Sequence, residues 1–458
     1  MRTQIMRFHR RSHIKSDGQA IIIISIMVTL LFVVGALVLD VGNMDSERAA
    51  MQAASDAAAL AGAEYLPDTD AAREAALQMA QENGYVVGEH GVVEIQTIPN
   101  PDGAHPSRYL VIIKKRVVHS LAQVIGLRNS VVTTHALATR TVNLPLKITG
   151  GGRYGFTDVQ NPAQFGPYAR YSYGDAYSTM YLDDGTPNPQ YEPGGYDYAI
   201  MIPADYESRN GTSILRVEIF DPETWNVGNA PNAGPGKIDE IRYNPPGVPR
   251  PTHVRTTTRY RLYAPDNTLI AEATYGPETT SATDQKWITP TGFQFDLNSY
   301  IESGEAAQFR LNVKTIDGSS ENGYNLRAGP PTGTFDPDNG TEILAIGRLP
   351  TNFNVSGTIR IDFGIIPELE YGGKIYVRKF DTDVGAKTIT YRDKLGNSWP
   401  GLLASNGTFV TDTIDLPNGY PGSVLDVEYV AGSQDTSVWE MYYEGLVAGQ
   451  PGDIRLID

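Results

Sequence analysis

The feature that most constrains this chain is an uncharged apolar run of 20 residues near its N-terminus, from Ala20 to Leu39. Only Ser25 and Thr29 in this run have polar side chains. At about 1.5 Å rise per residue, a helix of this length matches a hydrocarbon core of roughly 30 Å, and it pairs its backbone groups internally. We therefore expect a transmembrane helix at residues 20–41, preceded by a basic cytoplasmic tail at residues 1–19.

Charged residues are distributed unequally on the two sides of the run. Five basic residues and one acidic residue precede it, and the first charged residue after it is Asp40. The positive-inside rule places the N-terminus in the cytoplasm and the C-terminal region outside, so we expect a single-pass protein of the cytoplasmic membrane. A cleaved secretory signal is the alternative, but its apolar core is usually about 7–15 residues and small residues follow closely. Here they accumulate only from Ala49 onward, which favours a retained anchor.

The composition limits the partners of the external region. The part after Leu39 carries 32 basic and 52 acidic residues, a net charge of −20. Such a surface disfavours nucleic acid, and it favours solubility. The chain has no cysteine, so no disulfide stabilises it. With 41% hydrophobic residues, burial can supply the stability instead.

Residues 42–149 show helical and strand-like signals, and we expect them to form a small α+β membrane-proximal module. The alanine-rich tract from Val41 to Ala63 lacks proline, which predicts that the membrane helix continues through it. Met44, Met51 and Ala58 fall seven residues apart, as a seam that packs either on its own domain or on another helix. Further helices are expected at Asp70–Asn83 and His119–Ile125, and strands at Val92–Ile98, Tyr109–Ile113 and Val131–Thr139.

The composition changes at Gly150–Gly152, and turn residues and short strands follow. Apolar residues alternate with polar ones, for example at Leu215–Ile219 and Phe309–Val313, which is typical of antiparallel strands with one buried face. A second set of such runs begins near Ile343. The expected fold is therefore mostly β, with two tandem antiparallel β-sandwich domains at residues 150–340 and 341–458.

The residues that carry chemistry argue against an enzyme. Of seven histidines, only His253 belongs to the β region, where it follows a proline-rich loop. The sequence has no zinc-ligand spacing and no phosphate-binding glycine loop, so we assign no catalytic and no cofactor-binding residue. A pair of carboxylates acting as a glycosidase is the remaining catalytic alternative.

Two acidic loops resemble the start of a calcium site, namely Asp336-Pro-Asp338-Asn339-Gly340 and Asp381-Thr-Asp383. An EF-hand would need glutamate at position 12, which falls here on Gly347 and Arg392. The metal ligands are therefore unknown, and a structural calcium ion stays an expectation. The many tyrosines and the four tryptophans pack in a core or form a face that binds sugar or protein, and the sequence leaves both interpretations open.

The N-terminal segment resembles the TadE/TadG-like proteins of the Tad (Flp) pilus-assembly family. The resemblance rests on the basic tail, Gly18-Gln19, the single span, Asp40-Val41-Gly42 and the tract from Gln52 to Ala63. It implies a pseudopilin or minor pilus component of the cytoplasmic membrane, with a helix-plus-β module. Ile23 stands where a processed prepilin has glutamate, so cleavage after Gly18 is not expected. The von Willebrand metal motif of longer members is missing, because Glu321 occupies its last position.

These observations predict a non-catalytic, membrane-anchored component of Tad/Flp-type pilus assembly or cell-surface attachment, with extracytoplasmic β-sandwich domains. The expected partners are membrane lipid, other pilus-system membrane proteins, and an extracellular protein or glycan. The alternative is a surface carbohydrate-binding protein or adhesin independent of pili.

Overall fold

The computed structural model describes most of the chain, and it divides into two units, residues 1–140 with 454–458, and residues 141–453. Each unit is considered by itself below. The described residues are 17–103, 105–119, 121–148, 160–173, 175–222, 255–277, 283, 286–332, 340–353, 357–381, 386–431, 435–446 and 452–457.

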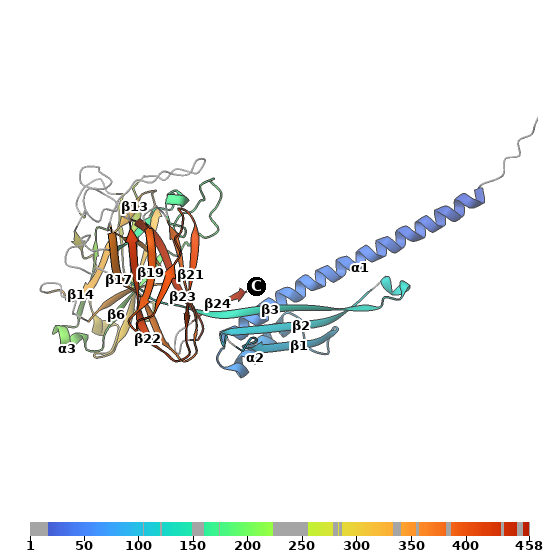
Figure 1. The fold of residues 1–458 in the computed structure, drawn as a ribbon, viewed down its shortest axis with the longest axis horizontal. Coiled ribbons are helices and arrows are strands. Elements are labelled where there is room, and N and C mark those ends of the chain that lie inside the picture. The colour runs from blue at the N-terminus through green and yellow to red at the C-terminus, as the bar shows by residue number, and fades with distance from the viewer. Residues whose placement is uncertain are drawn as a thin grey trace, which may run out of the picture. The chain divides into compact units, whose positions relative to one another are not determined.

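The first unit is built around one uninterrupted helix of 48 residues, α1 (Asp17–Glu64), which Figure 1 shows extending well past the strands that it packs on. The alanine-rich tract continues the apolar run without a break, as predicted. The other elements of this unit are α2 (Thr69–Glu82), β1 (Val92–Pro99), β2 (Arg108–Val118), η1 (Ala122–Ile125), the first part of β3 (Asn129–Asn143), and β24 (Asp453–Ile457).

The strands of this unit form an antiparallel sheet in the order β1-β2-β3. One face of β2 is apolar and buried, with Tyr109, Val111 and Ile113 fully covered. α2 begins where the Asp68 carboxylate accepts hydrogen bonds from the backbone N–H groups of Asp70 and Ala71. Its buried residues are alanines at every fourth position, which allows α1 and α2 to pack closely.

The second unit is almost entirely antiparallel β-structure, which confirms the predicted fold class together with the N-terminal helix. Its earlier elements are β4 (Leu146–Lys147), β5 (Gln160–Phe165), η3 (Tyr171–Tyr173), β6 (Tyr196–Ile202), α3 (Tyr206–Asn210), β7 (Ile214–Phe220), β8 (Thr257–Tyr263), β9 (Leu269–Tyr275), β10 (Trp287–Ile288), β11 (Gln294–Asp296), η4 (Leu297–Ser299), β12 (Ala307–Asp317), β13 (Glu321–Gly323) and β14 (Asn325–Gly329). Its later elements are β15 (Glu342–Ile346), β16 (Arg348–Phe353), β17 (Gly357–Leu369), β18 (Gly373–Asp381), β19 (Ala386–Asp393), β20 (Ser398–Gly401), β21 (Phe409–Leu416), β22 (Tyr420–Ala431) and β23 (Asp435–Glu444).

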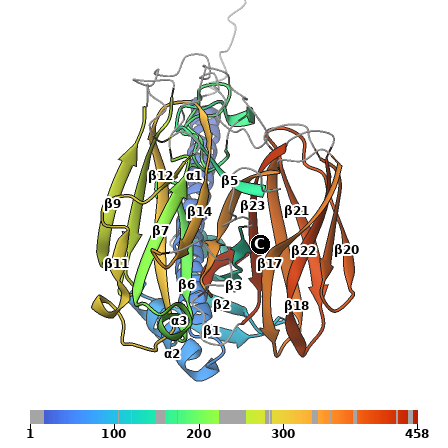
Figure 2. The same ribbon diagram turned by 90° about the vertical axis from the view of Figure 1, so that its left-hand side faces the viewer.

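One ten-stranded sheet runs through the whole second unit in the order β20-β19-β22-β17-β4-β15-β6-β12-β8-β9. The two-residue strand β4 joins its earlier and later strands, because Leu146 pairs with Gly364 of β17 and with Ala345 of β15. In the facing layers, β10, β11 and β14 each pair with β7, whereas β16 and β18 pair with β23, and β21 pairs with β18. Figure 2 shows the strands of this unit as two groups of facing layers.

A single apolar core also extends through both groups of strands, from Leu144 to Tyr443. The residue limits expected for two separate sandwiches stay a prediction. The expected limit between residues 149 and 150 lies outside the described residues, and the one between residues 340 and 341 lies inside the second unit.

Candidate functional site

The Asp40 side chain links α1 to the connection between β2 and β3 through hydrogen bonds. Although it directly follows the apolar run, this side chain is buried. Its Oδ2 accepts hydrogen bonds from the backbone N–H groups of Leu121 at 3.0 Å and Ala122 at 2.6 Å. These amides stand at the start of η1, whose own sequence supplies no side-chain cap. Bonds from two N–H donors to the carboxylate offset the cost of burying it.

Asp40 is the first member of a stripe on one face of α1. The members recur at intervals of three and four residues, so they lie one above another on the helix: Asp40, Met44, Glu47, Met51, Ser55, Ala58 and Gly62. Met51, Ser55 and Ala58 are fully buried. α1 contacts β2 and α2 within the unit. The alanine-rich seam therefore packs on its own module, which was one of the two predicted alternatives.

Small residues in the stripe let the helix backbone approach the sheet closely. The hydroxyls of Ser55 and Thr134 are 2.8 Å apart and buried, and Gln52 donates to the backbone carbonyl of His135 at 2.9 Å. At Gly62, any Cβ atom would overlap the ring of Tyr109. The ring therefore fills the space that glycine leaves open.

A polar cluster lies in the middle of the same contact. Lys115 of β2 donates to Glu47 of α1 at 2.5 Å, and the hydroxyl of Tyr85 donates to the same carboxylate oxygen at 3.2 Å. The ammonium group of Lys115 also lies 5.3 Å from the centre of the Tyr85 ring. Burial, with the negative charge of Glu47, raises the pKa of Tyr85 to about 12.

The titration of Tyr85 provides a test of this cluster. The folded-state pKa of Tyr85 is raised from an ordinary value of about 10. The protonated side chain therefore stabilises the fold fully below a pH of about 10, and this stabilisation is lost as the pH rises from there through about 12. We expect the difference in phenolate absorbance between the full chain and its Tyr85→Phe variant to have a midpoint near 12. The Glu47→Gln background should lower this midpoint. A midpoint of 10 in both backgrounds would contradict the cluster.

The Asp40 contact has its own expected outcome. Asp40→Ala removes the acceptor of two backbone N–H groups, and a hydrogen bond to a charged group contributes about 1.5–3 kcal/mol. Amide exchange at Leu121 and Ala122 should accelerate roughly 10- to 100-fold, as measured by mass spectrometry on detergent-solubilised chain. Asp45→Ala is the control, because Asp45 is exposed on the same helix. Equal exchange rates in the two variants would argue against the contact.

Beyond the module, the described side chains in the apolar half of α1 are not buried against other described parts of the chain. The side chains described between Ile21 and Leu39 are exposed, and Phe32 reaches 74% exposure. Among the described residues, this is the one helix long and apolar enough to cross a membrane. A helix that is apolar all round and uncovered is typical of a membrane span.

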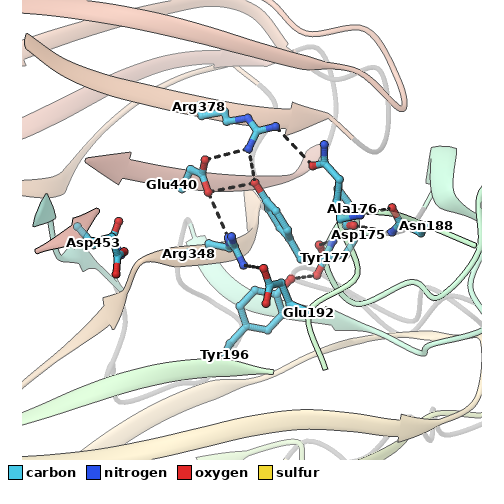
Figure 3. Close-up of polar contacts among 12 residues, drawn as sticks. Asp175, Ala176, Tyr177, Asn188, Glu192, Tyr196, Arg348, Arg378, Glu440 and Asp453 are labelled. Atoms are coloured by element: carbon cyan, nitrogen blue, oxygen red, sulfur yellow. Dashed lines mark hydrogen bonds and ion pairs between the residues drawn. The ribbon is translucent and has the colours of Figure 1, made fainter. Parts of the chain in front are cut away.

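In the second unit, a connected polar cluster surrounds Glu440 of β23, and Figure 3 shows it. Arg378 donates to Glu440 at 3.2 Å and to the hydroxyl of Tyr177 at 3.1 Å. Arg348 donates to the other oxygen of Glu440 at 3.2 Å and lies 3.8 Å from the centre of the Tyr177 ring. Glu192 also pairs with Arg348, at 3.2 Å. The positive charges of the two arginines are thus balanced by the negative charges of Glu192 and Glu440.

Tyr177 and Glu192 belong to the segment between β5 and β6, and a second contact holds this segment in place. Tyr196 donates to the fully buried carboxyl of Asp175, which also accepts the backbone N–H of Tyr177 at 2.8 Å. Burial raises the pKa of Asp175 and that of Tyr196 above their ordinary values. Burial alone would lower the pKa of Arg348, but Tyr177 and Glu440 hold it above its ordinary value. These contacts attach the segment to β16, β18 and β23, which is a structural role.

The histidines described in the structure do not come together as a catalytic group. His105 pairs with Asp102 at 2.7 Å, and His119 with the hydroxyl of Ser130 at 2.8 Å. His253 lies outside the described residues, as do Asp336, Asp338 and Asp383 of the expected calcium loops. Within the described part of the chain, no three histidine or acidic residues are placed to hold a metal ion. The calcium site stays a prediction.

The aromatic residues of the second unit are largely core residues. Trp439, Tyr198, Tyr260, Tyr391 and Tyr429 are among its largest fully buried side chains. Trp439 packs edge-on against Phe363, with ring centres 4.9 Å apart. Core packing, one of the two predicted alternatives, therefore accounts for these aromatics, whereas Trp225 lies outside the described residues.

The fold and the contacts of α1 define a class: a protein with one exposed apolar helix that continues into an α+β module, followed by a large β unit. Residues 18–65 match the Tad family, described as "Putative Flp pilus-assembly TadE/G-like". This confirms the predicted resemblance of the N-terminal segment. The match covers the apolar run, Asp40 and the whole stripe on α1.

The other comparisons add little. No curated protein matches the chain. Among solved structures, the chain is similar to the major capsid protein P2 from bacteriophage PM2, at 12% identity and a TM-score of 0.16, over 57% of this chain and 91% of that protein.

Proposed function

We propose that this chain is a non-catalytic, membrane-anchored component of a Tad/Flp-type pilus-assembly system, with its N-terminus in the cytoplasm and its β unit outside. The observation that carries the proposal is the coincidence of the family match with one continuous structural element. Residues 18–65 contain both the uncovered apolar face and the stripe that fastens it to the module. The role of the segment is then to hold the module at the membrane while the apolar face meets other pilus-system helices.

The charge distribution supports the orientation. The residues before α1 are basic, and those after Leu39 carry a net charge of −20. Because the chain has no cysteine, single-cysteine variants report topology without background. In spheroplasts, a membrane-impermeant maleimide should label Glu89→Cys, which is exposed in the module, and should label Ser12→Cys only after lysis. The opposite labelling pattern would overturn the orientation.

The assembly role needs a separate experiment. Deleting the gene should abolish pili seen by electron microscopy, and the full chain supplied in trans should restore them. A photocrosslinking residue at Phe32, on the uncovered face of α1, should capture other pilus-system membrane proteins. The same residue at Glu89 is the control, because it lies in the module. Normal pili in the deletion strain would refute the role in assembly.

A further inference from the structure

The connection between β2 and β3 presents apolar side chains to its surroundings. We call residues 118–119 and 121–127 the hairpin tip. Val118 is 64% exposed, Leu121 40% and Leu127 55%. Neighbouring Val131 on β3 is also exposed. Such a group is costly in water, and it marks a surface that binds something apolar.

The tip lies at the level where α1 leaves its apolar run. The Asp40 carboxylate holds the N–H groups of Leu121 and Ala122 there. The side chains of Leu121 and Ala122 line a groove together with α1 residues as far back as Thr29. From Thr29 to Asp40 the helix rises roughly 16 Å. If α1 spans a bilayer, the tip is therefore placed at the boundary between headgroups and acyl chains.

The charge of the hairpin differs from that of the rest of the chain. Between Asp102 and Asp158 the sequence has no acidic residue, although the whole chain has a net charge of −16. Lys114 and Lys115 are paired with Glu94 and Glu47.

Nearest the tip, Arg116 and Arg128 are exposed, and their guanidinium groups form no ion pair with any described residue. A basic, apolar surface next to a membrane span matches an anionic lipid interface.

We propose that the hairpin tip inserts Val118, Leu121 and Leu127 into the leaflet from which α1 emerges, with Arg116 and Arg128 at the phosphates of anionic lipids. The module is then held to the bilayer at two places, the helix and the tip. This inference rests on the proposed membrane anchoring. Because α1 and the tip are joined at Asp40, the second contact fixes the rotation of the module about the helix axis.

Depth-dependent quenching in nanodiscs tests the proposal on the full chain. Leu127→Cys carries an environment-sensitive fluorophore, and lipids with spin labels near the headgroup serve as quenchers. We expect strong quenching at Leu127→Cys and none at Tyr65→Cys, which is also exposed but lies roughly 38 Å along α1 from Asp40. For Phe32→Cys, which lies roughly 12 Å along α1 from Asp40, lipids with spin labels deep in the acyl chain replace the headgroup quenchers and report whether α1 itself is in the bilayer. Quenching at Phe32→Cys without quenching at Leu127→Cys would overturn the tip insertion, whereas loss of both would refute the anchoring.

Lipid charge and added proteins separate the remaining outcomes. Each arginine should favour insertion about fivefold in bilayers that contain phosphatidylglycerol, so Arg116→Gln and Arg128→Gln should reduce quenching there and leave it unchanged in phosphatidylcholine. Equal quenching in both lipids would refute the role of the arginines. Shielding of Leu127→Cys only after other pilus-system proteins are added would identify a protein contact and overturn the proposal.

Discussion

Replacing Asp412 with alanine is expected to lower the free energy of unfolding of the second unit by about 3–5 kcal/mol. Asp412 of β21 and Lys379 of β18 form an ion pair of 2.6 Å in which each side chain is 3% exposed. Tyr391 also donates to Asp412 at 2.6 Å, and Lys379 donates to the carbonyl of Leu402. The variant would leave a buried ammonium group without its counter-charge, which is the costly way to break such a pair.

Tryptophan fluorescence during denaturation measures this effect selectively, because all four tryptophans of the chain lie in the second unit. The same two strands contain an exposed pair, Lys374 and Asp415, at 3.8 Å with 43% and 76% exposure. Asp415→Ala is therefore the matched control, and it should cost at most about 1 kcal/mol. Equal losses of unfolding free energy in the two variants would show that the buried pair contributes no more to stability than the exposed pair. Replacing both buried partners with apolar residues should be close to neutral.

Gly62→Leu is expected to destabilise the first unit by about 3 kcal/mol, because the new side chain must displace the fully buried Tyr109 ring. Leucine favours a helix over glycine by up to about 1 kcal/mol, which is too little to compensate. Hydrogen exchange in β2 should therefore accelerate, as measured by mass spectrometry on the full chain.

Gly42→Leu is the matched control for this substitution. It places the same residue in the same helix, at a position where a Cβ atom would meet nothing within 4 Å. We expect exchange in β2 to be unchanged or slower in this variant, because leucine is the better helix former. If Gly62→Leu and Gly42→Leu behave alike, the close approach of α1 to Tyr109 does not limit the packing.

Local patterns allowed most of the elements to be predicted. The uncharged run and the alanine-rich tract predicted α1, and Asp68 and Gly84 correctly bracketed α2. The alternation at Phe309, Leu311 and Val313 predicted β12, where all three side chains are fully buried. These signals depend on neighbours two to four residues apart, so one sequence is enough to find them.

Contacts between distant residues could not be predicted in the same way. The role of Asp40 depends on two backbone N–H groups more than 80 positions later. Because backbone groups are not specific to a residue type, the sequence does not indicate which of them pair with Asp40. Its only signal was an acid directly after the apolar run. Likewise, Leu146 and Gly364 pair through β4, a strand too short to show alternation. The sheet that β4 completes is set by long-range pairing, which sequence spacing does not record.

The uninterrupted course of α1 has a mechanical consequence. The helix contains no proline, and it passes from its apolar half into the buried stripe without a change of secondary structure. A tilt or rotation of the apolar half must therefore be transmitted to β2 and β3 as a rigid-body movement, because Asp40, Glu47 and Ser55 hold the strands to the same face. The helix and its module therefore move as one rigid body, and Asp40 lies where the apolar half of the helix meets the module.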